Sequence, residues 1–299
     1  MDRQTRVLLL LTQVCFGVFP VLGKLALQAF EPRAILVWRL LTAASVMLAL
    51  ALARHGRAAL PAARDLGALL VLSVLGVMVN QLLFLEGLQR STAVNAGLLM
   101  TVIPVATLAV AVLLGQERLT LRRQSGMLLS AAGVAWLFVH RGAEIGGRTR
   151  TGDLMLTANA VSYSTYLVLA KPVLRRLPQL VVVAWVFVFA ALIVPWFALD
   201  VAWVPEAAGR RHWLALGGVL LFPTLLAYLL NTIVLARTRA STTAAYVLLQ
   251  PFVSAVLALL WLGERPEPGV WVTGAAVVAG LWLVSQPAAP APQAPATPP

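Results

Sequence analysis

The side chains that could do chemistry in this sequence are polar groups placed inside long apolar runs. In a membrane such groups are tolerated only where they face other helices or water. In the first run, Gln13 and Lys24 share a helix face with Gly17 and Pro20, because the steps between these residues are four, three and four. Similar groups recur in later runs, and the candidates for lining a cavity are Gln13, Lys24, Asn80, Gln81, Asn95, Thr101, Asn159, Tyr163, Tyr166, Tyr228, Asn231, Thr243, Tyr246 and Gln250.

Amides, hydroxyls and phenols would give such a cavity a neutral, hydrogen-bonding lining. Such a lining would suit a zwitterion or a polar neutral metabolite. A strongly charged substrate would find no fixed opposite charge at mid-depth. The same residue types also hydrogen-bond between packed helices, and the sequence leaves this alternative open for each of them. The tyrosines favour the cavity, since a phenol facing lipid away from the interface is unfavourable.

Three charged side chains, Lys24, Arg39 and Glu86, are expected at similar depth near the outer boundary of the membrane. Lys24 lies roughly 26 Å along its helix, where its ammonium could snorkel to water. In the alternative interpretation the three charges form an outer gate, or bind a substrate carboxylate as it leaves. Glu86 is also the candidate for proton coupling, because it is the acidic residue predicted inside a span and away from a helix end.

The sequence lacks the combinations of residues that a catalytic or metal-binding site requires. His55, His140 and His212 fall in loops or at span ends, and Cys15 is the single cysteine. We therefore predict no catalytic residue, no metal site and no cofactor. The sequence contains no GxxxxGK[ST] motif for an ATP-driven pump. The formal charge of +12 reflects arginines at span ends, so we expect no nucleic-acid partner.

The elements that must position these residues are membrane-spanning helices. The 299 residues are 60% hydrophobic and 11% charged, with a mean hydropathy of +0.87, and a span needs roughly 20 apolar residues. The sequence predicts an all-α integral membrane protein with ten transmembrane helices, at residues 7–29, 34–53, 66–88, 93–115, 124–140, 153–171, 179–200, 213–235, 240–262 and 269–285. The Pro/Ala-rich residues 286–299 are predicted to be a disordered tail.

The two lysines of the sequence reveal an internal repeat. They are 171 − 24 = 147 residues apart, and the same offset relates Trp38 to Trp185, Arg90 to Arg237, Pro104 to Pro251, and Glu117 to Glu264. This offset predicts two five-helix repeats, 7–140 and 153–285. Because five is odd, the second repeat must enter the membrane from the opposite side. Both glutamates are interpreted as structural carboxylates that satisfy the amides opening the next helix.

Several stretches together resemble one family of transporters. They are FGVFPVLGKLAL in the first run, NQLLFLEGLQRSTAVNAGLLMTVIPVATLAVAVLLGQERLTLRRQSGMLLSAAGVAWL in the third to fifth, and the weaker echo AYLLNTIVLARTRASTTAAYVLLQPFVSAVLALLWLGERPEPGVWVTGAAVVAGLWL near the end. The sequence resembles the EamA family of the drug/metabolite transporter superfamily. The resemblance implies ten helices in two inverted five-helix repeats, a central cavity, and movement of small metabolites, often amino acids and usually outward.

The predicted function is secondary transport, in the outward direction, of amino acids or similar small polar metabolites by alternating access. Drugs, sugars or nucleosides are alternative cargo, and a membrane accessory subunit without transport is the alternative class. Arginine distribution predicts both termini in the cytoplasm, and the Arg-, Ala- and Pro-rich composition points to a bacterial inner membrane. The partners are a small-molecule substrate and the lipid bilayer; a homodimer is neither indicated nor excluded by the residues.

Overall fold

The computed structural model of the chain describes residues 1–91, 96, 99–100, 102–117, 120–140, 149–250, 252–253, 256–257, 272, 275–276, 279–280 and 282–283. These residues form helices and their connections, without a strand among them. Helical stretches long and apolar enough to cross a membrane are Arg3–Ala26, Pro32–Ala59, Ala63–Arg90, Gln179–Phe197 and Arg210–Arg237. They correspond to the predicted runs 7–29, 34–53, 66–88, 179–200 and 213–235.

The first of these stretches is interrupted by a turn, and the second and third change helix type within their length. Val18, in a turn, separates the first two helices, and the third stretch contains a π-helical segment. The elements are α1 (Arg3–Gly17), α2 (Phe19–Ala26), α3 (Pro32–His55), η1 (Gly56–Ala59), α4 (Ala63–Ser73), η2 (Val74–Met78) and α5 (Val79–Arg90). Pro20 is accommodated because it stands in the first turn of α2, where a missing N–H costs no helical bond.

The rest of the described chain continues the all-helical pattern. Its elements are α7 (Val102–Leu113), α8 (Leu121–His140), α9 (Arg150–Leu174), α10 (Gln179–Ile193), η4 (Val194–Phe197), α11 (Arg210–Val219), η5 (Leu220–Leu226), α12 (Ala227–Arg237), α13 (Ala240–Ala245) and η6 (Tyr246–Leu249). Pro104 lies in the first turn of α7, where proline is tolerated, so it need not kink a helix interior. The predicted tail 286–299 and most of the predicted run 269–285 lie outside the described residues.

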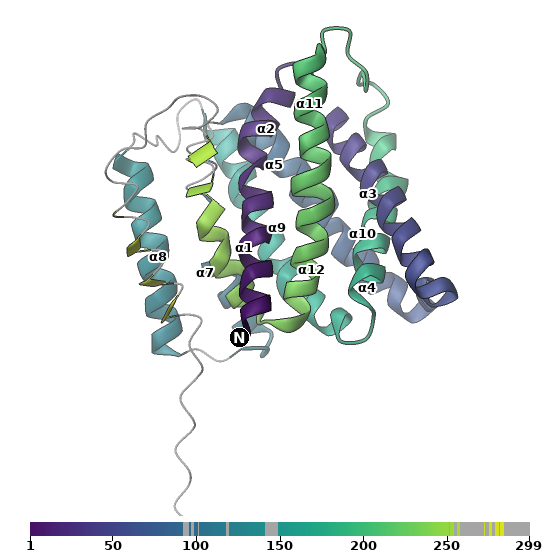
Figure 1. Cartoon of the computed structure of the whole chain (residues 1–299). Coiled ribbons are helices and arrows are strands. Elements are labelled where there is room, and N and C mark those ends of the chain that lie inside the picture. Colours follow the sequence, from purple (N-terminus) through teal and green to yellow (C-terminus); the bar gives the residue numbers. More distant parts are fainter. Residues whose placement is uncertain are drawn as a thin grey trace, which may run out of the picture.

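Elements that are 147 residues apart begin at equivalent positions. Arg3 and Arg150 open α1 and α9, Pro32 and Gln179 open α3 and α10, and Ala63 and Arg210 open α4 and α11. Both π-helical segments, η2 and η5, interrupt their helices at this offset to within a residue or two. In Figure 1, α4 lies below α5 whereas α11 lies above α12, so these two stretches run in opposite directions.

Packing brings helices far apart in sequence together in one bundle. α9 packs against α5 and α7, α10 against α3, α1 against α12, and α11 against α2. The α5–α9 pair is closely spaced because two glycines face each other: a Cβ on Gly87 would lie 3.0 Å from the Gly152 carbonyl oxygen, and one on Gly152 would lie 2.9 Å from the Gly87 oxygen. Figure 1 shows α8 at the edge of this bundle.

Each lysine closes the C-terminal end of a helix. Lys24 Nζ donates to the carbonyl oxygens of Leu88 (2.7 Å) and Ser91 (3.2 Å) at the end of α5. The carbonyls of a last helical turn lack intrahelical partners and carry partial negative charge, so an ammonium satisfies them. The expected pairing of Lys24 with Glu86 is therefore not formed, and snorkelling of Lys24 to water stays a prediction. Its ammonium is held by backbone, which the residue types did not reveal.

Lys171 repeats this arrangement 147 residues later. Its ammonium donates to the carbonyl oxygens of Leu235, at 2.7 Å, and of Thr238, at the end of α12. Both lysines thus span the same sequence separations to their acceptors, 64 and 67 residues. Each one fixes the end of α5 or α12 relative to the helix that carries the lysine.

We expect Lys24→Met and Lys171→Met each to lower the thermal unfolding midpoint of the purified protein by several degrees. Hydrogen bonds from a charged donor contribute about 1.5–3 kcal/mol each, and methionine leaves the carbonyls unpaired. The measurement is a melting curve in detergent. The control is Arg175→Met, which removes an exposed cation one turn beyond Lys171. Midpoints of both lysine variants equal to that of the control would contradict the role of these bonds.

Candidate functional site

Buried polar side chains gather where the two halves of the chain meet, and we call this group the central polar cluster. It receives residues from α3, α5, α9, η5 and α12. Each side chain belongs to a residue at most 8% exposed. The members of the central polar cluster are Arg39, Gln81, Tyr163, Tyr166, Thr224, Tyr228 and Asn231.

One hydrogen-bond chain links the two halves through Tyr228. Gln81 Nε2 donates to the Tyr228 hydroxyl oxygen at 3.0 Å, and this hydroxyl donates to the Gly76 carbonyl oxygen at 3.0 Å. Gln81 and Tyr228 are themselves 147 residues apart, so the bond joins two positions that the sequence offset relates. Gly76 lies in the π-helical segment η2, a type of interruption that is often found at functional sites.

Arg39 is a fully buried cation in the cluster, only 1% exposed. Its Nε donates to Thr224 Oγ1 at 2.9 Å, and its guanidinium carbon lies 4.3 Å from the centre of the Phe19 ring. Thr224 stands near the middle of the 28-residue stretch Arg210–Arg237. From the sequence, Arg39 was predicted near the outer boundary of the membrane. The cavity was predicted to contain no fixed charge. Both expectations are corrected, because the long side chain carries its charge inward to Thr224.

The predicted cluster of Lys24, Arg39 and Glu86 is not formed. Lys24 is bound by carbonyls of α5, Arg39 by Thr224, and the Glu86 carboxylate pairs with Arg90 one helical turn later. The physical reason is that each charge finds a nearer partner on its own or a neighbouring helix. A role of Glu86 in proton coupling stays a prediction.

Several polar atoms of the cluster have no hydrogen-bond partner within the described part of the chain. They are Arg39 Nη1, Gln81 Oε1, and both amide atoms of Asn231. A buried donor or acceptor without a partner costs about 1–3 kcal/mol, and few such atoms persist in folded proteins. Because these four atoms are two donors and two acceptors, the cluster is chemically matched to a ligand that offers both.

Aromatic rings surround the central polar cluster. Phe16 meets Tyr163 and Tyr228 edge-on, with centroids 6.5 Å and 5.7 Å apart, and Phe187 meets Tyr228 at 4.9 Å. Phe19, beneath the Arg39 guanidinium, stacks on Phe84 at 4.8 Å. Phe16, Phe19 and Phe187 were not predicted as site residues, because nothing distinguishes an apolar ring from the other apolar residues of a membrane span.

Other predicted cavity residues make contacts between helices instead. Asn80 and Asn159 exchange bonds, each amide nitrogen donating to the other's backbone carbonyl oxygen at 3.3 Å and 2.6 Å. Gln250 Nε2 donates to Gln13 Oε1 at 2.8 Å. These bonds match the packing role that the sequence left open as the alternative.

The remaining predicted residues lie away from the central polar cluster or outside the described residues. Thr243 is 2.7 Å from the Thr238 hydroxyl, near the Lys171 ammonium. Tyr246 packs in a separate apolar cluster with Leu9. Asn95 and Thr101 lie outside the described residues.

Glu117 satisfies a helix start, but of a helix in the other half. Its carboxylate accepts from the Ser241 backbone N–H at 3.1 Å and from the Ser241 hydroxyl, at the beginning of α13. This partner was not predicted from the sequence, and it is available because α13 packs against α7, whose end leads to Glu117. The predicted bond to the next helix stays a prediction. Glu264 lies outside the described residues.

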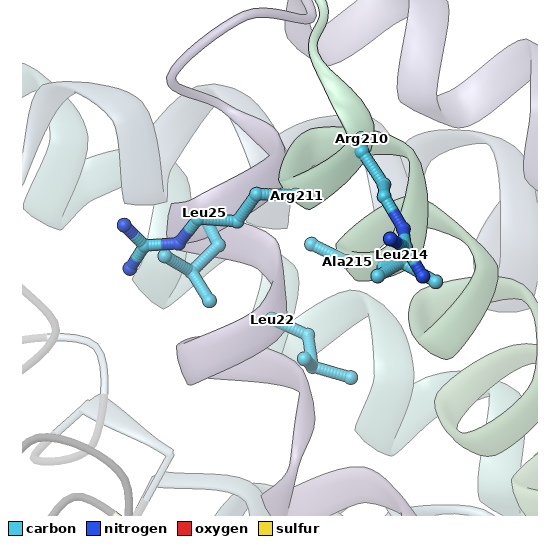
Figure 2. A pocket seen from close by; sticks show the side chains of 6 residues that line it. All are labelled: Leu22, Leu25, Arg210, Arg211, Leu214 and Ala215. Carbon is cyan, nitrogen blue, oxygen red and sulfur yellow. The ribbon is translucent and has the colours of Figure 1, made fainter.

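A separate pocket of about 460 Å³ opens between α2 and α11. Figure 2 shows the Arg211 side chain extending over α2 beside Leu25, and the Arg210 guanidinium beside Leu214. The residues that line it are Leu22, Leu25, Arg210, Arg211, Leu214 and Ala215. None of these belongs to the central polar cluster, and both arginines are exposed, so this pocket does not supply the orphaned polar atoms with partners.

The chain is similar to known proteins over most of its length. The model of a family described as "EamA-like transporter family" matches residues 5–139 and again residues 150–286. A "Probable terminal-alkyne amino-acid exporter" of Streptantibioticus cattleyicolor is 30% identical over 250 residues, which cover 82% of each chain. An "Uncharacterized transporter" of Archaeoglobus fulgidus is 25% identical, over 95% of this chain and 98% of that one.

A solved crystal structure is also similar in shape. It is 19% identical in sequence, and the match has a TM-score of 0.79 and covers 95% of this chain and 97% of the other. At this identity the likeness establishes the fold alone.

Proposed function

Because this chain belongs to the EamA-like transporter family of membrane proteins, we propose that it is a secondary transporter that exports amino acids or similar small polar metabolites by alternating access. The observation that carries the proposal is the central polar cluster, whose buried atoms lack partners within the described protein. The relative named as an amino-acid exporter supports the substrate class.

The proposed architecture is ten transmembrane helices in two inverted five-helix repeats, 7–140 and 153–285. Three observations support it: the common 147-residue offset of helix starts, the matching caps made by Lys24 and Lys171, and the opposite directions of α4–α5 and α11–α12 in Figure 1. Inverted repeats of this kind place the substrate site between the halves, near the middle of the membrane.

Alternating access requires contacts between the halves that can break and re-form. The bond between Gln81 and Tyr228 joins equivalent positions of the two repeats, so it lies close to the proposed symmetry axis. Rocking one half against the other would change this bond and the Tyr228 bond to Gly76 together. The substrate would enter from the cytoplasm of a bacterium, through an inner membrane with both termini inside.

The test is mass spectrometry of spent medium from bacteria that overproduce the protein. We expect one or a few amino acids to accumulate with the wild type and with Gln28→Leu, an amide loss at an exposed position. Asn231→Leu should reduce the accumulation by about tenfold or more, because it removes two unpartnered polar atoms from the site.

Expression of all three proteins is measured in the same membranes. Accumulation of sugars, nucleosides or drugs would replace the proposed substrate and keep the transport function. Media indistinguishable from those of empty-vector cells would contradict export and favour the accessory subunit.

A further inference from the structure

We infer that the central polar cluster recognises the zwitterionic backbone of a free α-amino acid, with Arg39 binding the carboxylate and the amide oxygens of Gln81 and Asn231 receiving the ammonium. This inference rests on the proposed function and assigns it a substrate class and binding residues. It excludes sugars, nucleosides and phosphate esters as the principal cargo.

Arg39 carries a positive charge inside the protein. A guanidinium stays protonated even when buried, and Arg39 is 1% exposed. Its observed partners are a neutral hydroxyl and an aromatic ring, and within the described residues no carboxylate forms an ion pair with it. A buried charge without a counter-ion is strongly unfavourable. The compensating anion is therefore best supplied by the substrate.

Arg39 still has N–H groups that can donate hydrogen bonds. Arg39 Cζ lies over the Phe19 ring, 4.3 Å from its centre, and Nε donates to Thr224. A guanidinium has five N–H donors, so this bond leaves the donors of both Nη atoms for other acceptors. Nη1, which has no partner among the described residues, keeps its donors free. A carboxylate is the planar, two-oxygen acceptor that fits such an edge.

The amide oxygens of Gln81 and Asn231 are acceptors that complement the donors of Arg39. Gln81 Oε1 and Asn231 Oδ1 have no donor at hydrogen-bond geometry, although the Tyr163 hydroxyl lies beside the Asn231 amide. An ammonium offers three N–H donors. Thr224, Tyr228 and Asn231 follow one another at steps of four and three, so they share a face of the same helical stretch. Arg39 is bonded to the first of these residues, and Gln81 to the second. The donors and acceptors therefore surround one short segment.

The charge balance selects among anions. One guanidinium neutralises a carboxylate, whereas a phosphate ester carries nearly two negative charges. Lys24, a partly buried cation of α2, is occupied by the carbonyls of Leu88 and Ser91. The aromatic rings of Phe16, Phe19 and Phe84 provide apolar surface beside the central polar cluster. An amino acid with an apolar side chain is the best match.

The experiment is counterflow in proteoliposomes made with the purified full-length protein. One set follows a tritiated mixture of the standard L-amino acids, and parallel sets follow tritiated uridine, glucose and glucose 6-phosphate. We expect counterflow of amino acids by the wild type and a loss of about tenfold or more in Arg39→Gln. Arg54→Gln, the same change at an exposed position of α3, should match the wild type.

Competition on the wild type tests the same idea without any variant. Unlabelled L-leucine should inhibit amino-acid counterflow, whereas L-leucinamide, which lacks the carboxylate, and 4-methylpentanoate, which lacks the ammonium, should not. Arg39→Lys should retain part of the transport, because a lysine keeps the charge and loses the planar donor edge. Melting curves show whether Arg39→Gln remains folded; removing an unpaired buried charge should leave the midpoint equal or higher.

The outcomes separate the inference from the proposed function. Amino-acid counterflow that survives in Arg39→Gln, or inhibition by leucinamide equal to that by leucine, overturns the inference and leaves the transport function standing. Counterflow of uridine, glucose or glucose 6-phosphate alone also overturns it. Absence of counterflow for every probe, with folded protein, contradicts the proposed function and with it the inference.

Discussion

Replacing Gly76 by alanine is expected to abolish recovery of folded protein. A Cβ at this position would lie 2.6 Å from Cγ and 2.7 Å from Cε2 of the Tyr166 ring, closer than carbon atoms approach without strain. Tyr166 is 1% exposed and stacks on Tyr163, so its ring has little room to withdraw. Overpacking of a tight core costs about 1–3 kcal/mol and sometimes more. Here it would also displace the carbonyl that Tyr228 binds.

The measurement is the yield of monodisperse protein after detergent extraction, with the melting midpoint of whatever is recovered. Gly67→Ala is the matched control, because Gly67 lies in the helix before the same π-helical segment and a Cβ there meets nothing within 4 Å. It should be neutral or stabilising by up to about 1 kcal/mol, since alanine favours a helix over glycine. A Gly76→Ala protein with unchanged yield and midpoint would show that the close contact is not required.

The second expected result is that Tyr228→Phe lowers transport by about 10- to 100-fold while the protein stays folded. The variant removes the hydroxyl that bonds both Gln81 and Gly76. It leaves a buried amide and a buried carbonyl without that partner, at about 1–3 kcal/mol each, and 1.4 kcal/mol corresponds to tenfold. Because the hydroxyl bonds residues of both halves, its loss should disturb substrate binding and the alternating access that we propose.

Counterflow of the proposed amino-acid substrate in proteoliposomes measures this effect. Tyr246→Phe serves as the control, because Tyr246 packs in a separate apolar cluster with Leu9 and Leu108. A double-mutant cycle with Gln81→Met tests the pair directly: if the bond matters, the second substitution should add little to the first. Full transport by Tyr228→Phe, or simple additivity in the cycle, would remove the bond from the mechanism.

The sequence was informative about the elements and their internal faces. Long apolar runs require spanning helices because lipid offers no hydrogen bonds to the backbone, and the runs at 66–88 and 213–235 are helices within Ala63–Arg90 and Arg210–Arg237. The steps of four and three residues placed Tyr228 and Asn231 on one face. Several sequence stretches also predicted the family, and the family model matches both halves of the chain.

Apolar runs, residue spacing and motifs were therefore enough to predict the all-helical membrane class, the 147-residue offset, the family and a set of polar faces. Which of these faces meet became clear from the folded chain. Helical periodicity fixes the face a residue occupies but not the partner that face receives, so Asn80 and Asn159 bond each other while Gln81 bonds Tyr228. Backbone partners carry no mark in the sequence, which is why the caps at Lys24 and Lys171 were not foreseen. A long side chain also acts far from its own Cα, and for this reason Arg39, expected at the outer boundary, brings its buried charge to Thr224 at the centre.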